Sequence, residues 1–206
     1  AHPSGGGLEF KEISMLSPSS LPLLDHVSFT VERGEIVAVA GVQGNGQTEL
    51  AQTILGLATP NSGEILLEGI DITHANPRKS LDAGIGFIPE DRSTDGIISS
   101  FSIAENLVLD QYKDSRFAAG PMLKLGIIAQ NARDKEEEFD IRLTSINDPI
   151  SSLSGGNQQK VVVAREMSKD LNLLVANQPT RGVDVGSIEF IHKRIVEVRD
   201  QNIPVL

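Results

Sequence analysis

The fold of this chain is decided by residues 35–48, which read EIVAVAGVQGNGQT. The first six residues are apolar and rich in β-branched side chains, as in a buried parallel strand. The glycines that follow predict a turn, and residues 47–57 place Leu50, Ile54 and Leu57 on one helical face. A strand, a glycine turn and a helix in this order predict an α/β fold with a mostly parallel sheet.

The glycine turn matches the phosphate-binding loop pattern except at its lysine, where Gln47 stands. Backbone N–H groups and the start of the helix can still bind phosphate oxygens, and Thr48 can offer a hydroxyl to Mg²⁺. Losing the lysine removes one charge-assisted bond, at a cost of about 1.5–3 kcal/mol. A packing turn without a ligand is the alternative interpretation. We expect weakened binding of ATP and Mg²⁺ by Gly41, Gly44, Asn45, Gly46, Gln47, Thr48 and Glu49.

The composition limits the class of protein. The 206 residues fit one domain, and 39% hydrophobic with 22% charged residues are ordinary values for a globular protein. A net charge of −10 argues against binding to nucleic acid, whose phosphate backbone repels an acidic surface. The chain has no cysteine, and no apolar run approaches the roughly 20 residues needed to span a membrane.

The order of patterns predicts the domain organisation. Residues 1–7 are interpreted as a linker or cloning scar, and residues 8–206 as one domain that is cut short at its C-terminus. Within it we expect an edge strand at residues 8–13 and an inserted helical subdomain at about residues 93–152, with its clearest helix at 129–139. Further strands are expected at 24–31, 64–67, 84–89 and 173–176. Further helices are expected at 188–199 and, with Ser154 as its N-cap, from there to about residue 169.

The stretch LSGGNQQ, residues 153–159, resembles the signature motif of ATP-binding-cassette (ABC) ATPases. From about residue 8 to 206 the order of motifs is similar to an ABC nucleotide-binding domain. The resemblance implies a P-loop NTPase of ABC type: a mostly parallel core sheet, an antiparallel β subdomain and an inserted helical subdomain. It also implies that the signature residues contact ATP held by an opposite domain, and these are Ser154, Gly155, Gly156 and Gln158.

Other family positions have lost their charges. The apolar strand 173–176 ends in Asn177 and Gln178, where the family has Asp and Glu, so no catalytic residue is intact. Losing a general base typically lowers a rate by about 10²–10⁴, so we expect very slow hydrolysis at this site. Glu90 stands at the Q-loop position, where a carboxylate can partly replace the charge missing at Asn177. A solvated surface acid is the alternative.

Asp184 lies in the stretch RGVDVG, residues 181–186, which matches the D-loop region. The resemblance implies that Asp184 faces the dimer partner. The alternative is a solvated turn without a partner.

Two sets of short sequence stretches narrow the resemblance to particular branches of the ABC family. PEDR at 89–92 and LSGGNQQK at 153–160 resemble the C-terminal half of the fused ATPases of bacterial simple-sugar importers. Residues 41–50, 177–182 and 186–194 are closer to the nucleoside importers. The resemblance implies an N-terminal ATP-binding domain in the same polypeptide, two permease subunits and a solute-binding lipoprotein, at the cytoplasmic face of the bacterial membrane.

Two other interpretations of the sequence stay open. The chain could belong to a simple-sugar importer ATPase, or it could be a nucleotide-binding scaffold that never takes part in hydrolysis. A DNA-repair ATPase of the same class is disfavoured by the acidic charge and the missing basic stripe.

Overall fold

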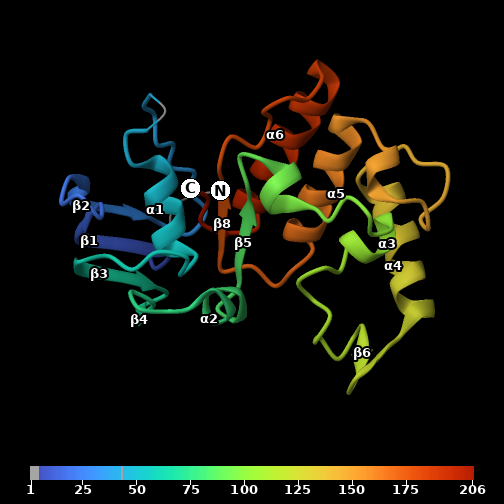
Figure 1. Ribbon diagram of the computed structural model, residues 1–206, viewed down its shortest axis with the longest axis horizontal. Coiled ribbons are helices and arrows are strands. Elements are labelled where there is room, and N and C mark those ends of the chain that lie inside the picture. Colours follow the sequence, from blue (N-terminus) through green and yellow to red (C-terminus); the bar gives the residue numbers. More distant parts are fainter. Residues whose placement is uncertain (1–4, 43) are drawn as a thin grey trace. The chain divides into compact units, whose positions relative to one another are not determined.

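The computed structural model describes residues 5–42 and 44–206 (Figure 1), and these fall into two compact units. Unit 1 comprises the described residues of Ala1–Phe87 together with Lys169–Asn177 and Arg194–Leu206, and unit 2 comprises Ile88–Ser168 and Gln178–Lys193. Residues 1–4 of the expected linker and Gln43 of the glycine loop lie outside the described residues.

Unit 1 contains a four-stranded antiparallel sheet of order β2-β1-β3-β4. β1 (Leu8–Leu16) pairs with β2 (Pro22–Val31) on one side and with β3 (Ser62–Leu67) on the other, and β4 (Ile70–Asp71) follows β3. The expected antiparallel subdomain is therefore confirmed. The prediction of β1 as an edge strand was wrong, because Phe10 lies opposite both Phe29 and Ile65.

One hydrophobic core joins this sheet to α1 (Gln47–Ile54). Phe10 stacks on Phe29 with ring centroids 4.7 Å apart, and the buried side chains of Leu50 and Ile54 belong to the same cluster. The expected helix ends at Ile54 rather than at Leu57, whose side chain is exposed. α2 (Pro77–Asp82) follows with Asn76 as its N-cap.

A second sheet, of β5 (Ile85–Ile88) and β8 (Leu173–Ala176), is short. β5 pairs with β8, and Val205 forms parallel bridges to both Leu174 and Ile36. The expected strand at 84–89 and the strand at 173–176 are confirmed.

The expected buried strand at residues 35–40 was wrong in its extent. Ile36 forms one isolated bridge, residues 37–42 have no regular structure, and Ile36 and Val39 are 39% and 45% exposed. The hydrogen bonds of this segment to Val205 involve only Glu35 and Val37. A buried strand needs paired neighbours along its length, and this pairing is too short to provide them.

Unit 2 is mainly helical (Figure 1). The 13-residue helix α5 (Gly155–Met167) is its most buried element, because Val161 to Ala164 are 0% exposed. The guanidinium of Arg165 donates to the carbonyl oxygens of Gly96 at 2.9 Å and Asn106 at 3.2 Å. The other elements are η1 (Arg92–Gly96), α3 (Ile103–Asn106), β6 (Ala118–Ala119), β7 (Met122–Leu123), α4 (Leu125–Glu138), η2 (Ile150–Ser152) and the first half of α6 (Val185–Asp200).

Candidate functional site

The glycine loop leads into the N-terminus of α1. Gly44 and Gly46 have φ angles of 89° and 92°, a region that favours glycine. A Cβ atom on Gly46 would lie only 2.7 Å from the carbonyl oxygen of Leu23. Gly46 is also the N-cap of α1 and provides no side-chain acceptor. The N–H groups of the first turn can therefore bind the oxygens of a phosphate.

The side chains at the start of α1 do not add positive charge to this loop. The Gln47 side chain folds back, and its Nε2 donates to the carbonyl oxygen of Val39 at 3.2 Å. Thr48 is exposed, so its hydroxyl is accessible to a metal ion. Glu49 is the acidic residue of the first turn, and its charge competes with a phosphate for the helix dipole.

The segment that leads to the glycine loop and β8 run in the same direction beside Val205. Residues 36 and 174 both run parallel to Val205, so the carboxyl ends of their segments, at Gly41 and Asn177, point the same way. Asn177 is half-buried, and Gln178 is exposed with a φ angle of +47°. Both side chains are neutral amides, which are weak substitutes for the carboxylates that Mg²⁺ prefers.

The donor set therefore fits a phosphate held by backbone N–H groups better than it fits a fully coordinated Mg²⁺. Thr48 is the hydroxyl that would contact the ion beside the phosphate oxygens. Within residues 5–42 and 44–206, no group of three His, Cys, Asp or Glu side chains could hold a metal ion.

Ser154 and two glycines form the start of α5. The Ser154 hydroxyl oxygen accepts from the backbone N–H of Asn157 at 3.4 Å, which confirms Ser154 as the N-cap. A Cβ on Gly155 would lie 2.5 Å from Arg92 Nη2, and a Cβ on Gly156 would lie 2.7 Å from Ser187 Oγ. A side chain at Gly156 would therefore collide with the hydrogen-bonded pair of Asp184 and Ser187, whereas at Gly155 only the end of the flexible Arg92 side chain would have to move.

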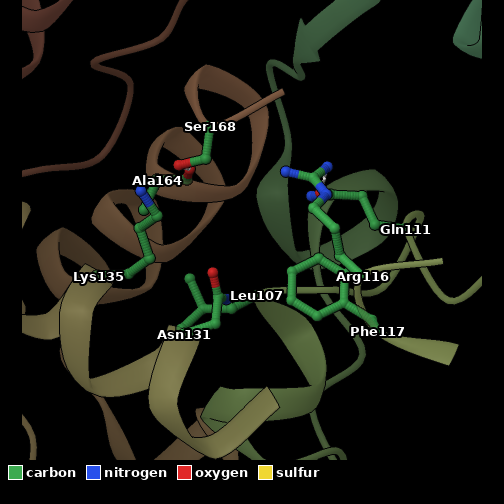
Figure 2. Close-up of a pocket in the computed structure, with 8 residues that line it drawn as sticks. All are labelled: Leu107, Gln111, Arg116, Phe117, Asn131, Lys135, Ala164 and Ser168. Atoms are coloured by element: carbon green, nitrogen blue, oxygen red, sulfur yellow. Dashed lines mark hydrogen bonds between the residues drawn. The ribbon is translucent and has the colours of Figure 1, made fainter. Parts of the chain in front are cut away.

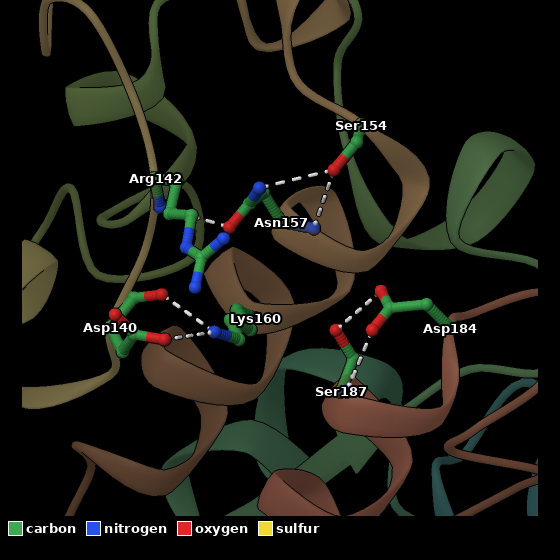
Figure 3. A network of polar contacts seen from close by, with 7 residues as sticks. All are labelled: Asp140, Arg142, Ser154, Asn157, Lys160, Asp184 and Ser187. Atoms are coloured by element: carbon green, nitrogen blue, oxygen red, sulfur yellow. Dashed lines mark hydrogen bonds and ion pairs between the residues drawn. The ribbon is translucent and has the colours of Figure 1, made fainter.

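Gln158, which was expected to contact the nucleotide, points back into its own segment. Its Nε2 donates to the carbonyl oxygens of Leu153 at 3.1 Å and Ile150 at 3.3 Å. Asn157 was absent from the expected site, yet its side chain contacts the Ser154 hydroxyl at 3.1 Å (Figure 3). The sequence signal for Asn157 was its position at the third residue of a capped helix.

Asp184 caps α6 next to the start of α5. Its carboxylate accepts from the Ser187 N–H at 3.0 Å and from the Ser187 hydroxyl at 2.8 Å (Figure 3). The Ser187 hydroxyl is the main cause that lowers the pKa of Asp184 below its usual value. The carboxylate is therefore held ionised beside Gly156.

Glu90 has a partner that the sequence did not reveal. Its carboxylate forms an ion pair with Arg181, and Arg92 Nη1 donates to the Arg181 carbonyl oxygen at 3.2 Å. The charge of Glu90 is therefore compensated within unit 2.

Unit 2 also contains a cavity of about 100 Å³ in its helical part (Figure 2). Two cations of its wall are already paired, Arg116 with Asp114 at 2.7 Å and Lys135 with Glu138 at 2.6 Å. The cavity therefore offers a ligand no uncompensated charge. Its wall is formed by Leu107, Gln111, Arg116, Phe117, Asn131, Lys135, Ala164 and Ser168.

A glycine loop that leads into a helix, and a second helix that starts with Ser-Gly-Gly, fit an ATP-binding domain of the P-loop NTPase class. The family model described as ABC transporter matches residues 24–181, and the chain belongs to this family. In the described part of the chain, no helix combines the length and apolar character needed to cross a membrane.

Curated relatives match the chain over nearly its whole length. The nucleoside import ATP-binding protein NupA of Lactococcus lactis subsp. cremoris is 43% identical over 100% of the chain and 41% of that protein. The glucose import ATP-binding protein TsgD13 of Haloferax volcanii is 42% identical over 97% of the chain and 36% of that protein. The guanosine import ATP-binding protein NupO of Bacillus subtilis is 40% identical over 100% of the chain and 40% of that protein. The chain thus spans about 40% of the length of these relatives.

Solved structures support the fold. A dimeric bacterial ABC transporter cassette aligns with a TM-score of 0.80 and 21% identity, covering 96% of this chain and 85% of that one. An ATP-binding cassette in its ADP conformation aligns with a TM-score of 0.78 and 20% identity, covering 98% and 80% of the two chains. The α/β fold of ABC type, expected from the resemblance, is thereby confirmed.

Proposed function

We propose that this chain is the ATP-binding domain of a bacterial nucleoside importer that completes an ATP site held mainly by a second domain. One contrast carries the proposal. The helix start Ser154-Gly155-Gly156 is intact, whereas the chain's own site has neutral amides at Gln47, Asn177 and Gln178. A scaffold that never took part in hydrolysis would gain nothing from the intact helix start.

The geometry of α5 supports a role in binding a phosphate held by another domain. Ser154 is exposed at the N-terminus of a 13-residue helix whose dipole favours an anion there. Gly155 and Gly156 add no side chain that would block the approach. In the partner's site, Ser154, Gly155 and Gly156 would contact the terminal phosphate of ATP, and Asp184 would face the other domain.

The chain's own site would bind Mg-ATP weakly and hydrolyse it very slowly. The loop of residues 41–48 retains backbone donors, but Gln47 adds no charge to the β and γ phosphates. Asn177 and Gln178 can orient water, but neither can act as its general base.

Nucleosides are the favoured cargo because residues 41–50, 177–182 and 186–194 follow the nucleoside importers. The relatives that match the whole chain, NupA and NupO, are named for nucleoside and guanosine import. A sugar importer is the second candidate, because the glucose import relative is 42% identical over 97% of the chain.

The chain's 41% share of NupA leaves room for a further ATP-binding domain in the same polypeptide. We further propose two permease subunits and a solute-binding lipoprotein as partners, with this domain at the cytoplasmic face of the membrane.

Substitution of Ser154 by Arg in the full-length protein tests the trans role. The bulky cation should fill the approach to the helix start, so ATP turnover should be lost. Ser102→Arg places the same side chain at the N-cap of α3 and should leave turnover unchanged. Equal ATP turnover in the wild type and the S154R variant would contradict the proposal and favour a nucleotide-binding scaffold that takes no part in hydrolysis.

A transport assay separates the two cargo candidates. Vesicles carrying the assembled transporter should accumulate labelled guanosine and not labelled glucose when ATP is supplied. Accumulation of glucose alone would assign the chain to the sugar importers.

A further inference from the structure

The side chain of Asn157 bridges two groups at the start of α5 (Figure 3). Its Oδ1 accepts from the backbone N–H of Arg142 at 2.9 Å, and its Nδ2 donates to Ser154 Oγ at 3.1 Å. A backbone N–H can only donate, so the amide oxygen must face Arg142 and the NH₂ group must face Ser154. The orientation of the amide is therefore fixed by its surroundings.

This orientation determines what the Ser154 hydroxyl can do. A hydroxyl has two acceptor lone pairs and one proton to donate. Both acceptor positions of Ser154 Oγ are used by Asn157, through its Nδ2 at 3.1 Å and its backbone N–H at 3.4 Å. The proton of Ser154 is left to point away from Asn157, toward the exposed side of the helix start.

The other serine-capped helix of unit 2 has the opposite arrangement. At the start of α3, the Glu105 carboxylate accepts from both the Ser102 N–H and the Ser102 hydroxyl at 2.7 Å. The proton of Ser102 is therefore used within its own cap. Both helices have serine at the N-cap, but their third residues act in opposite ways. Glu105 accepts the proton of its serine, whereas Asn157 donates to the oxygen of its serine.

The support for Asn157 extends to a turn before η2. Lys160 is 7% exposed, and its ammonium donates to the carbonyl oxygen of Asp140 at 2.6 Å and to the Asp140 carboxylate at 2.8 Å (Figure 3). The same ammonium lies 4.8 Å from the ring centroid of Phe190. Lys160 thus holds the turn that presents the N–H of Arg142 to Asn157.

We propose that Asn157 is a positioning residue that fixes the Ser154 hydroxyl as a hydrogen-bond donor to a phosphate oxygen. The inference rests on the proposed function, in which that oxygen belongs to the terminal phosphate of ATP bound by the other domain. Asn157 itself need not touch the nucleotide. Its effect passes through Ser154, which allows the two residues to be separated by experiment.

A double-mutant cycle in the full-length protein tests the inference, with steady-state ATP turnover as the readout. Ser154→Ala should lower turnover by about 10- to 100-fold, the worth of one hydrogen bond to a charged group. Asn157→Leu should lower it by about three- to tenfold, because the hydroxyl becomes free to occupy its three staggered positions. In the Ser154→Ala background, Asn157→Leu should cause no further loss.

Two controls separate positioning from general damage to the fold. Affinity for ADP, which lacks the terminal phosphate, should be the same in the wild type and in both single variants. Ser102→Ala removes a comparable cap from α3 and should leave ATP turnover unchanged.

A second variant keeps the test decisive if Asn157→Leu does not fold. Asn157→Asp is isosteric and still accepts from Arg142, but its carboxylate would take the proton of Ser154. Asn157→Asp should lower ATP turnover more when Ser154 is present than in the Ser154→Ala background. The added charge is the same in both backgrounds, so the difference measures the effect that passes through the Ser154 hydroxyl.

The outcomes distinguish the two proposals. The role of Asn157 would be overturned if Asn157→Leu lowered ATP turnover by the same factor with and without the Ser154 hydroxyl. It would also be overturned if Asn157→Leu left turnover unchanged while Ser154→Ala lowered it. Full turnover in both Ser154→Ala and Ser154→Arg would instead overturn the proposed trans function.

Discussion

Gln47 is the residue on which the proposed weakness of the chain's own phosphate loop mainly rests. Its amide is bonded to the Val39 carbonyl and brings no positive charge to the loop. The backbone donors of the loop are unaffected by this side chain. A single substitution can therefore separate the contribution of the charge from that of the loop.

Gln47→Lys should raise the affinity of this loop for Mg-ATP in the full-length protein by about 10- to 100-fold, which corresponds to about 1.5–3 kcal/mol for a charge-assisted bond. Hydrolysis at that site should stay slow, because Asn177 and Gln178 are unchanged. Calorimetric titration measures the affinity, and Gln47→Met is the neutral control of similar length. Equal affinities of the lysine and methionine variants would show that charge does not limit binding.

Gly156 and Gly126 allow a matched comparison, because each is the second residue of its helix, α5 and α4. A Cβ on Gly126 has no neighbour within 4 Å, whereas one on Gly156 would collide with Asp184 and Ser187. Gly126→Ala should stabilise the protein by up to about 1 kcal/mol through helix propensity. Gly156→Ala should destabilise it by about 1–3 kcal/mol through overpacking.

Denaturant unfolding of both glycine variants measures these changes. If Gly156→Ala were as stabilising as Gly126→Ala, Asp184 and Ser187 would have to move freely, and the packing of α5 against the start of α6 would not matter.

At the scale of elements, α5 holds unit 2 together through Arg165. Its guanidinium donates to the carbonyl oxygens of Gly96 and Asn106 and forms a buried pair with Glu166, with both side chains at most 6% exposed. η1 and α3 are thus tied to the same residue of α5. The position of these two elements depends on a charge that is fully surrounded by protein.

Arg165→Met should destabilise the protein by about 3–5 kcal/mol, because it removes one partner of a buried ion pair. Thermal unfolding of the full-length protein measures the loss. The double change Arg165→Met with Glu166→Gln should recover part of it, since no buried carboxylate then remains. A cost below about 1 kcal/mol, the value of an exposed pair, would contradict this account.

The helices and strands also show which structural features a sequence pattern could predict and which it could not. The strand at 173–176 and the N-cap at Ser154 were predicted correctly, because local apolar composition and capping chemistry determine them. β1 was misjudged because its number of neighbours depends on β3, which lies more than forty residues later. Residues 35–40 have strand composition, but their pairing depends on the short segment at Val205.

At the scale of the whole molecule, several carboxyl groups should make the free energy of unfolding depend on pH in the same direction. Hydrogen bonds or neighbouring cations lower their pKa below the usual values of 3.8 for Asp and 4.5 for Glu. In Asp140 the first cause is the hydrogen bond from Lys160, and in Asp184 it is the hydroxyl of Ser187. The groups with lowered pKa are Asp71, Asp91, Glu105, Asp114, Asp140, Asp184 and Asp200.

A carboxyl whose pKa is lower in the folded state contributes stability above its unfolded pKa, and this stability is lost as the pH falls through the folded pKa. The free energy of unfolding should therefore fall as the pH decreases below about 4.5. Urea titrations between pH 7 and pH 3 measure the trend. Asp140→Asn should make the free energy of unfolding depend less on pH. A urea midpoint that stays constant down to pH 3 would contradict the expected loss of stability.

The sequence by itself determined the α/β class, the resemblance to ABC ATPases and the missing charges at positions 47, 177 and 178. Composition, motif order and side-chain charge are properties of the chain before it folds. Only the tertiary structure decided that Gln158 points inward, that Glu90 pairs with Arg181 and that Asn157 holds Ser154. These contacts join separate segments or depend on the direction of a side chain, and both are set only when the backbone is in place.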